Sequence, residues 1–170
     1  MASKSKKQRL KKESATSLVL LSITVGILAL LQNKFGQFSD IRGFYGMHFF
    51  DGQHLWPFSE KTLLGDTKVQ HPVEYPALTG LIMWLLSFFV SPSDTAIYSY
   101  YRITAGLQIV LFMASAYLIY KLVGKKYAFY FILAPAVLYS LNRNWDIWAI
   151  AAMLLSIYLF EKKRFQLSAF

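Results

Sequence analysis

The chain has 170 residues, of which 55% are hydrophobic, 17% aromatic and only 16% charged, and its mean hydropathy is +0.37. These values exclude an ordinary soluble domain of this size and indicate a protein that crosses a membrane several times. The formal net charge of +9 does not indicate nucleic-acid binding, because much of it lies in a single tail. The chain has no cysteine, which excludes disulfides, thiol chemistry and a zinc–thiolate site.

The first fourteen residues form this basic tail. Its positive charges are Lys4, Lys6, Lys7, Arg9, Lys11 and Lys12. Basic residues beside a membrane span favour the cytoplasmic side, so they predict a cytoplasmic N-terminus and contact with anionic lipid headgroups. No small-residue cleavage site follows the apolar segment Ala15–Leu31, which is therefore interpreted as an uncleaved helix. We divide the chain into a cytoplasmic tail, residues 1–14, and a transmembrane region, residues 15–170.

About five apolar segments predict an all-α, polytopic transmembrane helix bundle. They are Ala15–Leu31, Pro76–Val90, Ile97–Val123, Tyr127–Leu141 and Trp145–Phe160. Alternation from a cytoplasmic N-terminus places the polar insert of about residues 33–75 outside, as a long external loop between the first two segments. We expect a multi-pass protein of the plasma membrane.

The later basic clusters conflict with this alternation. It places Lys121, Lys125 and Lys126 outside, and also the cluster 162–164, whereas basic residues beside spans are usually cytoplasmic. Two alternatives follow. Either one short apolar segment does not cross the membrane, or the charge bias is violated in the second half of the chain.

The insert is the most informative polar stretch. A structureless connection longer than roughly 12 to 15 residues usually serves binding or catalysis, unless it is disordered. Five aromatic residues argue against disorder: Tyr45, Phe49, Phe50, Trp56 and Phe58. Asp40 and Glu74 lie within a few residues of an apolar segment, where an ionisable side chain is costly and indicates function.

Three short segments resemble the GT-C superfamily of membrane glycosyltransferases, and within it the actinobacterial polyprenol-phosphate-mannose-dependent mannosyltransferases, glycosyltransferase family 87. They are Phe38-Ser39-Asp40-Ile41, Val73-Glu74-Tyr75-Pro76-Ala77-Leu78-Thr79-Gly80 and Asn144-Trp145-Asp146. The turn Asp51-Gly52-Gln53-His54, with Pro57 after it, also fits the first loop of the family. Family members are much longer, so the chain resembles their N-terminal part only, as a truncated or shortened relative would.

The resemblance implies transfer of a sugar from a polyprenyl-phosphate donor to a lipid or glycan acceptor on the outer face. It makes Asp40 the catalytic base, which must lie within hydrogen-bond reach of the acceptor hydroxyl. The plain alternatives for Asp40 are a helix cap, a solvated carboxylate, or an exposed ion pair with Arg42 that contributes about 0 to 1 kcal/mol. Arg42 and His71, with His48 or His54, are the candidate partners of the leaving phosphate.

Glu74, Tyr75 and Asp146 complete the candidate substrate-binding residues. Glu74 either stabilises a helix N-terminus or orients the acceptor. Together with His71 it offers two ligands to a divalent cation, fewer than the three of a usual catalytic zinc site, and no other cofactor is indicated. Tyr75 either anchors the chain at the membrane interface or offers its ring as a contact surface for a sugar. Asp146 either starts the last helix, with Asn144 as its cap, or shares a cavity with Asp40.

A different class of function remains open, namely a small non-enzymatic membrane protein such as a transporter subunit or an assembly factor. The charges fit a transport pathway less well, because such pathways usually place ionisable residues in mid-helix. No nucleotide-binding, kinase or hydrolase motif is present. The expected partners are membrane lipid, a polyprenyl-phosphate sugar donor and a lipid or glycan acceptor, and no nucleic acid.

Overall fold

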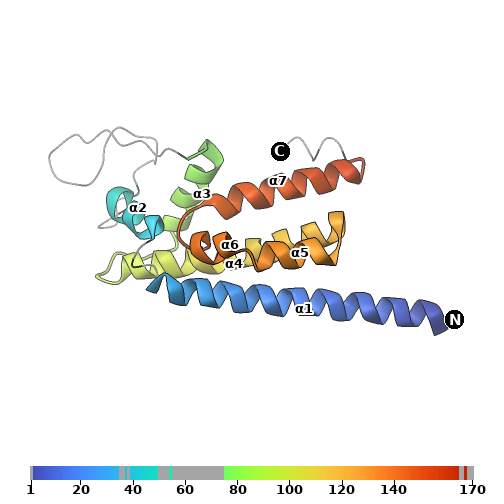
Figure 1. The fold of residues 1–170 in the computed structure, drawn as a ribbon. Helices are drawn as coiled ribbons and strands as arrows, with labels where there is room; N and C mark the ends of the chain where they lie inside the picture. The colour runs from blue at the N-terminus through green and yellow to red at the C-terminus, as the bar shows by residue number, and fades with distance from the viewer. Residues whose placement is uncertain are drawn as a thin grey trace.

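The computed structural model describes residues 2–34, 37, 39–49, 54, 75–164 and 167, without the side chains of residues 2–14 and of Met47. Within these ranges there are seven helices and no strand (Figure 1). The helices are α1 (Ala2–Gln32), α2 (Asp40–His48), α3 (Ala77–Ser87), α4 (Ala96–Val123), α5 (Lys125–Ile132), α6 (Pro135–Ser140) and α7 (Asp146–Glu161). The predicted all-α class is thus confirmed for the described residues. Most of the predicted external loop, residues 50–53 and 55–74, lies outside them.

Among the described residues, two helices are long and apolar enough to cross a membrane, fewer than the five segments predicted. They are the part of α1 from Ala15 to Gln32, and α4. Only 28% and 33% of their apolar windows are buried, so most of these side chains face outward. The second predicted segment forms only the 11 residues of α3. α7 has 16 residues, or about 24 Å, against a hydrocarbon core of about 30 Å.

A proline divides the fourth predicted segment, Tyr127–Leu141, into α5 and α6. α6 begins at Pro135, whose ring does not allow the preceding turn of helix to continue through it. The residue before it, Ala134, is extended, with φ −62° and ψ 128°. This stretch therefore packs as two short helices and not as one continuous span.

Three segments meet at one end of the bundle, which we name the loop end: residues 39–49, the stretch 75–95 that includes α3, and the turn 141–145. α2, which the sequence did not predict, and α3 cover this end (Figure 1). α1 runs toward the loop end, α4 runs away from it, α5 and α6 return, and α7 runs away again (Figure 1). We name the opposite end, where α4 and α7 stop and α5 begins, the basic end.

The course of α3 bears on the two alternatives that the charge pattern left open. α3 does not run the length of the bundle, so α4 starts at the same end as α2 and α7 (Figure 1). The basic residues at the end of α4, at the start of α5 and after α7 consequently lie at the basic end, where α1 also begins (Figure 1). This geometry fits the alternative in which one short segment does not cross.

Two groups of buried apolar side chains hold the bundle together. The first joins α1 to α4, α5, α7 and Leu141, the residue after α6, and consists of Leu18, Val25, Ala29, Phe112, Ala116, Ala128, Ile132, Leu141 and Ile147. Here α1 and α4 approach so closely that a Cβ atom at Gly26 would lie 2.9 Å from Cγ1 of Ile109. A glycine at this position permits the close contact of the two longest helices.

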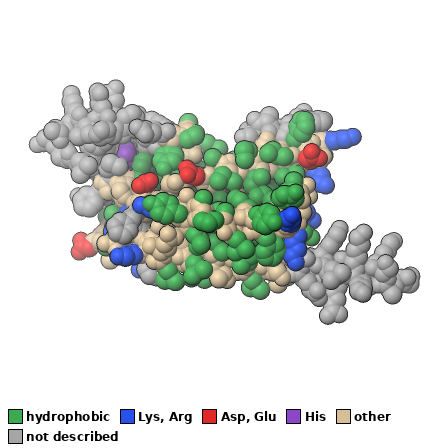
Figure 2. All heavy atoms as spheres, viewed as in Figure 1, with side chains coloured by type: hydrophobic (Ala, Val, Ile, Leu, Met, Phe, Trp, Pro, Cys, Tyr) green, Lys and Arg blue, Asp and Glu red, His purple; other side chains and the backbone are tan. Residues whose placement is uncertain are grey.

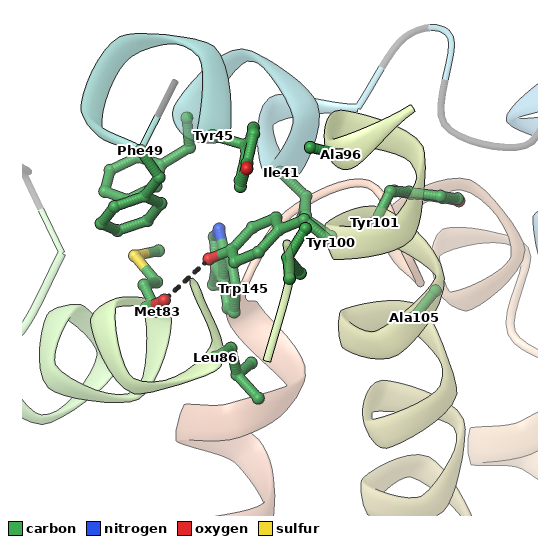
Figure 3. Packing of buried hydrophobic residues seen from close by; sticks show 12 residues of the cluster. Ile41, Tyr45, Phe49, Met83, Leu86, Ala96, Tyr100, Tyr101, Ala105 and Trp145 are labelled. Carbon is green, nitrogen blue, oxygen red and sulfur yellow. Dashed lines mark hydrogen bonds between the residues drawn. The ribbon is translucent and has the colours of Figure 1, made fainter. Parts of the chain in front are cut away.

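The second group closes the loop end (Figure 3). It unites Ile41, Tyr45 and Phe49 of α2 with Met83 and Leu86 of α3, Tyr100 of α4, and Trp145. The fully buried Tyr100 donates its hydroxyl proton to the carbonyl oxygen of Met83 at 3.0 Å (Figure 3). Its ring centre also lies 4.9 Å from that of Tyr45 and 6.4 Å from that of Trp145. These contacts fix α2 and α3 against the starts of α4 and α7.

Candidate functional site at the loop end

The start of α2 is bonded to the turn before α7. The hydroxyl of Ser39 shares its single proton between the carbonyl oxygens of Asn142 and Arg143, at 3.3 and 3.1 Å. The same hydroxyl accepts from the backbone amide of Ile41 at 3.2 Å and caps α2. The backbone amide of Asp40 donates to the carbonyl of Arg143 at 3.0 Å. The turn and the first residues of α2 therefore form one hydrogen-bonded unit.

Buried amide side chains hold the same turn from inside the bundle. Asn33, which follows α1, donates to the carbonyl of Leu141 at 3.0 Å. Gln108, in the middle of α4, donates to the carbonyl of Asn144 at 2.7 Å. Because a buried carbonyl without a partner is costly, these bonds favour a single conformation of the turn.

Asn142 is the bend of this turn. It is fully buried, and its φ of 64° lies in the left-handed region that asparagine adopts more readily than most residues. Its side-chain amide donates to the carbonyl of Gly26 in α1 at 3.4 Å. Asn142, one of the polar residues before the last helix, thus has a structural role, because it links α1 to the turn that precedes α7.

Asp40 and Asp146 are the first residues of α2 and α7, and both are exposed. Asp146 accepts from the side-chain amide of Asn144 at 2.7 Å, and its own backbone amide donates to the side-chain oxygen of Asn144 at 3.2 Å. Asp146 is thus in the first turn of α7, as one of the two alternatives has it, whereas the N-cap residue is Trp145 and not Asn144. A carboxylate at a helix N-terminus also interacts favourably with the helix dipole.

Tyr75 joins the two acids in one site. Burial raises the pKa of its hydroxyl, the carboxylates of Asp40 and Asp146 raise it further, and a backbone hydrogen bond from Trp145 lowers it. With a pKa raised from 10.0, Tyr75 is protonated at neutral pH and remains a hydrogen-bond donor. Two residues predicted as site residues, Asp40 and Asp146, thus both lie within electrostatic range of a third, Tyr75, although the three come from segments far apart in the sequence.

Arg42 lies on another side of α2. It follows Asp40 by two residues, or about 200° around the helix axis. Its guanidinium carbon lies 4.4 Å from the ring centre of Tyr98 in α4. The partner observed for Arg42 is therefore the aromatic ring of Tyr98.

The histidines named as candidates have different surroundings. Nδ1 of His54 lies 2.8 Å from the hydroxyl of Ser87, at the end of α3, whereas Tyr75 precedes the start of that helix. These two ends of α3 are roughly 15 Å apart at 1.5 Å per residue. His48 is buried and stacks on Phe44, with ring centres 4.3 Å apart. His71 lies outside the described residues.

Glu74 also lies outside the described residues, so the suggested divalent-cation pair of His71 and Glu74 stays a prediction. Within the described part of the chain, no group of three or more His, Asp or Glu side chains is arranged to hold a metal ion.

An apolar groove of about 550 Å³ lies between α3, α4 and α7. Its walls extend from Pro76 to Ile82 on α3 and its approach, and from Trp148 to Leu155 on α7. Pro76, which is in its lining, directly follows Tyr75 in the sequence. A smaller cavity of about 150 Å³ lies between α4, α6 and α7, with Asp146 in its lining.

Sequence reasoning missed the side chains that position these acids. Ser39 lies within a segment quoted for the family resemblance, but no role was predicted for it. Asn33 and Gln108 had a weak signal, because each is an amide within or directly after a long apolar helix, where a polar group needs a partner. Their partner is backbone more than 30 residues away, which no local pattern indicates.

No protein-family model, curated protein or solved structure matches this chain. The resemblance to GT-C enzymes therefore depends on the three short segments quoted above. Functional inference depends on the geometry of the loop end.

Proposed function

We propose that this chain is an integral membrane protein that resembles the N-terminal part of a GT-C mannosyltransferase and transfers a sugar from a polyprenyl-phosphate donor to a lipid or glycan acceptor. The observation that carries the proposal is that Asp40 and Asp146 both act electrostatically on Tyr75, which directly precedes Pro76 in the lining of the apolar groove. Each of these residues comes from a different one of the three segments that resemble the family.

The outward faces of the long helices support a membrane location. Large apolar side chains are exposed along α1, α4, α5 and α7, for example Leu20 (60%), Val110 (53%), Tyr130 (61%) and Met153 (57%). Figure 2 shows apolar side chains over the middle of the molecule and charged side chains toward its two ends. Soluble monomers rarely expose an apolar patch larger than a few hundred Å². Such a surface suits the hydrocarbon core of a bilayer, with the two ends at its faces.

Asp40 acts as the general base in the proposed reaction. The oxygen of the acceptor hydroxyl attacks the anomeric carbon of the donor, and the bond from that carbon to the phosphate oxygen breaks. The polyprenyl phosphate leaves with the electron pair of this bond, the anomeric configuration inverts, and the hydroxyl proton passes to the carboxylate of Asp40. The exposed position of Asp40 and the fixed backbone at its amide support this role.

Tyr75, Asp146 and the groove bind the two substrates. The protonated hydroxyl of Tyr75 donates to an oxygen of the sugar or phosphate, and Asp146 accepts from sugar hydroxyl groups. The apolar walls of the groove contact the polyprenyl chain, at about 25 cal/mol per Å² of apolar surface buried. The carbonyl oxygen of Arg143 accepts a hydrogen bond from the backbone amide of Asp40. This bond places a basic residue next to Asp40.

A second candidate function has an observation of its own. α3 and the turn after it expose Leu78 (61%), Leu85 (46%), Phe88 (53%) and Phe89 (74%). Asp40 and Asp146 also have a sufficient structural role as the first residues of two helices. These facts favour a non-enzymatic membrane subunit, such as a transporter subunit or an assembly factor, that docks a partner at the loop end.

The test is transfer of radiolabelled mannose from polyprenyl-phosphate-mannose to lipid acceptors, in membranes that contain the wild type, Asp40→Asn or Asp94→Asn. Asp94 is the matched control, since it is an exposed aspartate at the same end, in the turn before α4. We expect Asp40→Asn to lose roughly 10²- to 10⁴-fold in rate, as for a general base, and Asp94→Asn to keep the wild-type rate. Equal rates in all three would exclude Asp40 as the base. Folded wild-type protein without transfer would favour the non-enzymatic candidate.

A further inference from the structure

Four lysines at the basic end lie over aromatic rings. The Nζ atoms of Lys121, Lys125, Lys126 and Lys162 are 5.2, 5.3, 5.6 and 5.5 Å from the ring centres of Tyr117, Phe129, Tyr130 and Tyr158. These distances fall within the roughly 6 Å over which a cation and an aromatic face attract each other. We name these four pairs the lysine–aromatic belt.

In every pair the lysine lies about one helical turn farther out than its ring. α4 and α7 run toward the basic end, and there the lysine follows the ring by four residues, as in Tyr117 and Lys121. α5 runs the other way, and there the lysine precedes the ring by four residues, as in Lys125 and Phe129. Helix direction alone does not produce this order, because every helical side chain leans toward the N-terminus of its own helix. In all four pairs the lysine instead lies on the side of its ring that faces the basic end of the bundle.

The belt belongs to an excess of positive charge at one end. The described basic end carries six basic residues, Lys121, Lys125, Lys126, Lys162, Lys163 and Arg164, and one acid, Glu161. The loop end has Lys34, Arg42, Arg102 and Arg143 together with Asp40, Asp94 and Asp146. α1 also begins at the basic end, which brings the basic tail there (Figure 1). The two ends therefore face their surroundings with different charge.

We propose that the lysine–aromatic belt is a binding surface for the headgroups of anionic phospholipids. All four lysines are exposed, and the rings lie inward of them, next to the exposed apolar faces. Aromatic side chains are favoured at the boundary between hydrocarbon and headgroups, and a lysine one turn farther out extends its ammonium group to the lipid phosphates. This inference depends on the bilayer location in the proposed function, and does not depend on glycosyl transfer.

The test uses the full chain in phosphatidylcholine vesicles with a small amount of spin-labelled phosphatidylglycerol or spin-labelled phosphatidylcholine. Electron paramagnetic resonance measures the fraction of each labelled lipid that the protein restricts, and the ratio of the two gives the headgroup selectivity. The belt variant is Lys125→Gln with Lys126→Gln. The matched control is Lys34→Gln with Arg102→Gln, which removes two exposed positive charges from the loop end. Lys125→Arg with Lys126→Arg keeps the charge.

We expect the wild type to select phosphatidylglycerol, and the belt variant to lose roughly five- to 25-fold of this selectivity, since each of the two lysines that it removes gives about a fivefold preference near an anionic surface. The control and the arginine variant should keep the wild-type ratio. Equal restriction of both lipids by the wild type, or equal loss in the belt variant and the control, would overturn the proposal. No restricted lipid of either kind would overturn the bilayer location as well, which separates the failure of this inference from that of the proposed function.

Discussion

The backbone amide of Asp40 donates a 3.0 Å hydrogen bond to the carbonyl oxygen of Arg143. This bond joins the first residue of α2 to the turn that ends at the first residue of α7. Because Ser39 bonds to the same turn, α2 cannot shift along the bundle without breaking several buried hydrogen bonds. The positions of the Asp40 and Asp146 backbones are therefore set together, which is what a site with two cooperating acids requires.

Replacement of Asn142 tests whether its conformation holds the loop end together. Asn142→Ala loses the side-chain bond to α1 and places alanine at φ 64°, so we expect a loss of about 2 to 3 kcal/mol in the free energy of unfolding. Asn142→Gly loses the bond but adopts this φ without strain, so its loss should be about 1 kcal/mol. Unfolding in detergent measures both. Equal losses would show that the backbone conformation contributes nothing.

The high pKa of Tyr75 predicts a pH effect on stability. A group whose pKa is higher in the folded than in the unfolded chain stabilises the fold below the unfolded value, and this contribution is lost as the pH rises through the folded value. For Tyr75 the unfolded value is 10.0, and burial with the two nearby carboxylates raises the folded one. The melting temperature of the wild type, measured relative to Tyr75→Phe, should be constant below about pH 9 and fall above pH 10. A flat difference up to about pH 11 would argue against a raised pKa of Tyr75 in the folded chain.

Obstruction of the apolar groove tests its part in donor binding. Ala152 lines the groove on α7, so Ala152→Trp should narrow it. We expect the KM for the polyprenyl-phosphate sugar to rise about tenfold, or about 1.4 kcal/mol, which corresponds to roughly 55 Å² of apolar surface that the donor no longer buries. The neighbouring Met153 is exposed at 57% and does not line the groove. Met153→Trp is therefore the control, and equal kinetic changes in both variants would rule out a donor site in the groove.

Single cysteines test the orientation of the chain, since the wild type has none. If α3 does not cross the membrane, a membrane-impermeant maleimide added to intact cells should label Asp94→Cys but not Lys126→Cys. If α3 crosses, the two results are exchanged, because every later segment changes side. Permeabilised cells should give labelling of both variants and so control for access to each thiol.

Local patterns were enough to predict most of the helices, because hydropathy and helix signals act over a few residues. The apolar segments correspond to α1, α3, α4, the pair α5 and α6, and α7. Short helices were harder to predict. α2 has a polar, aromatic sequence without an apolar run, and its capping bond from Ser39 became visible only in the structure.

Composition and local patterns are sufficient to predict a helical, apolar chain with clustered basic residues, and to name Asp40, Tyr75 and Asp146 as candidate site residues. Two results come from the three-dimensional arrangement alone. α3 stays at the loop end, which brings the later basic clusters to the end where α1 begins (Figure 1). Asp40 and Asp146 both lie within electrostatic range of Tyr75. The physical reason is that both results depend on contacts between distant segments, namely the packing of Tyr100 against α3 and the bonds of Ser39 and Gln108 to the turn before α7, and these leave no periodic pattern in the sequence.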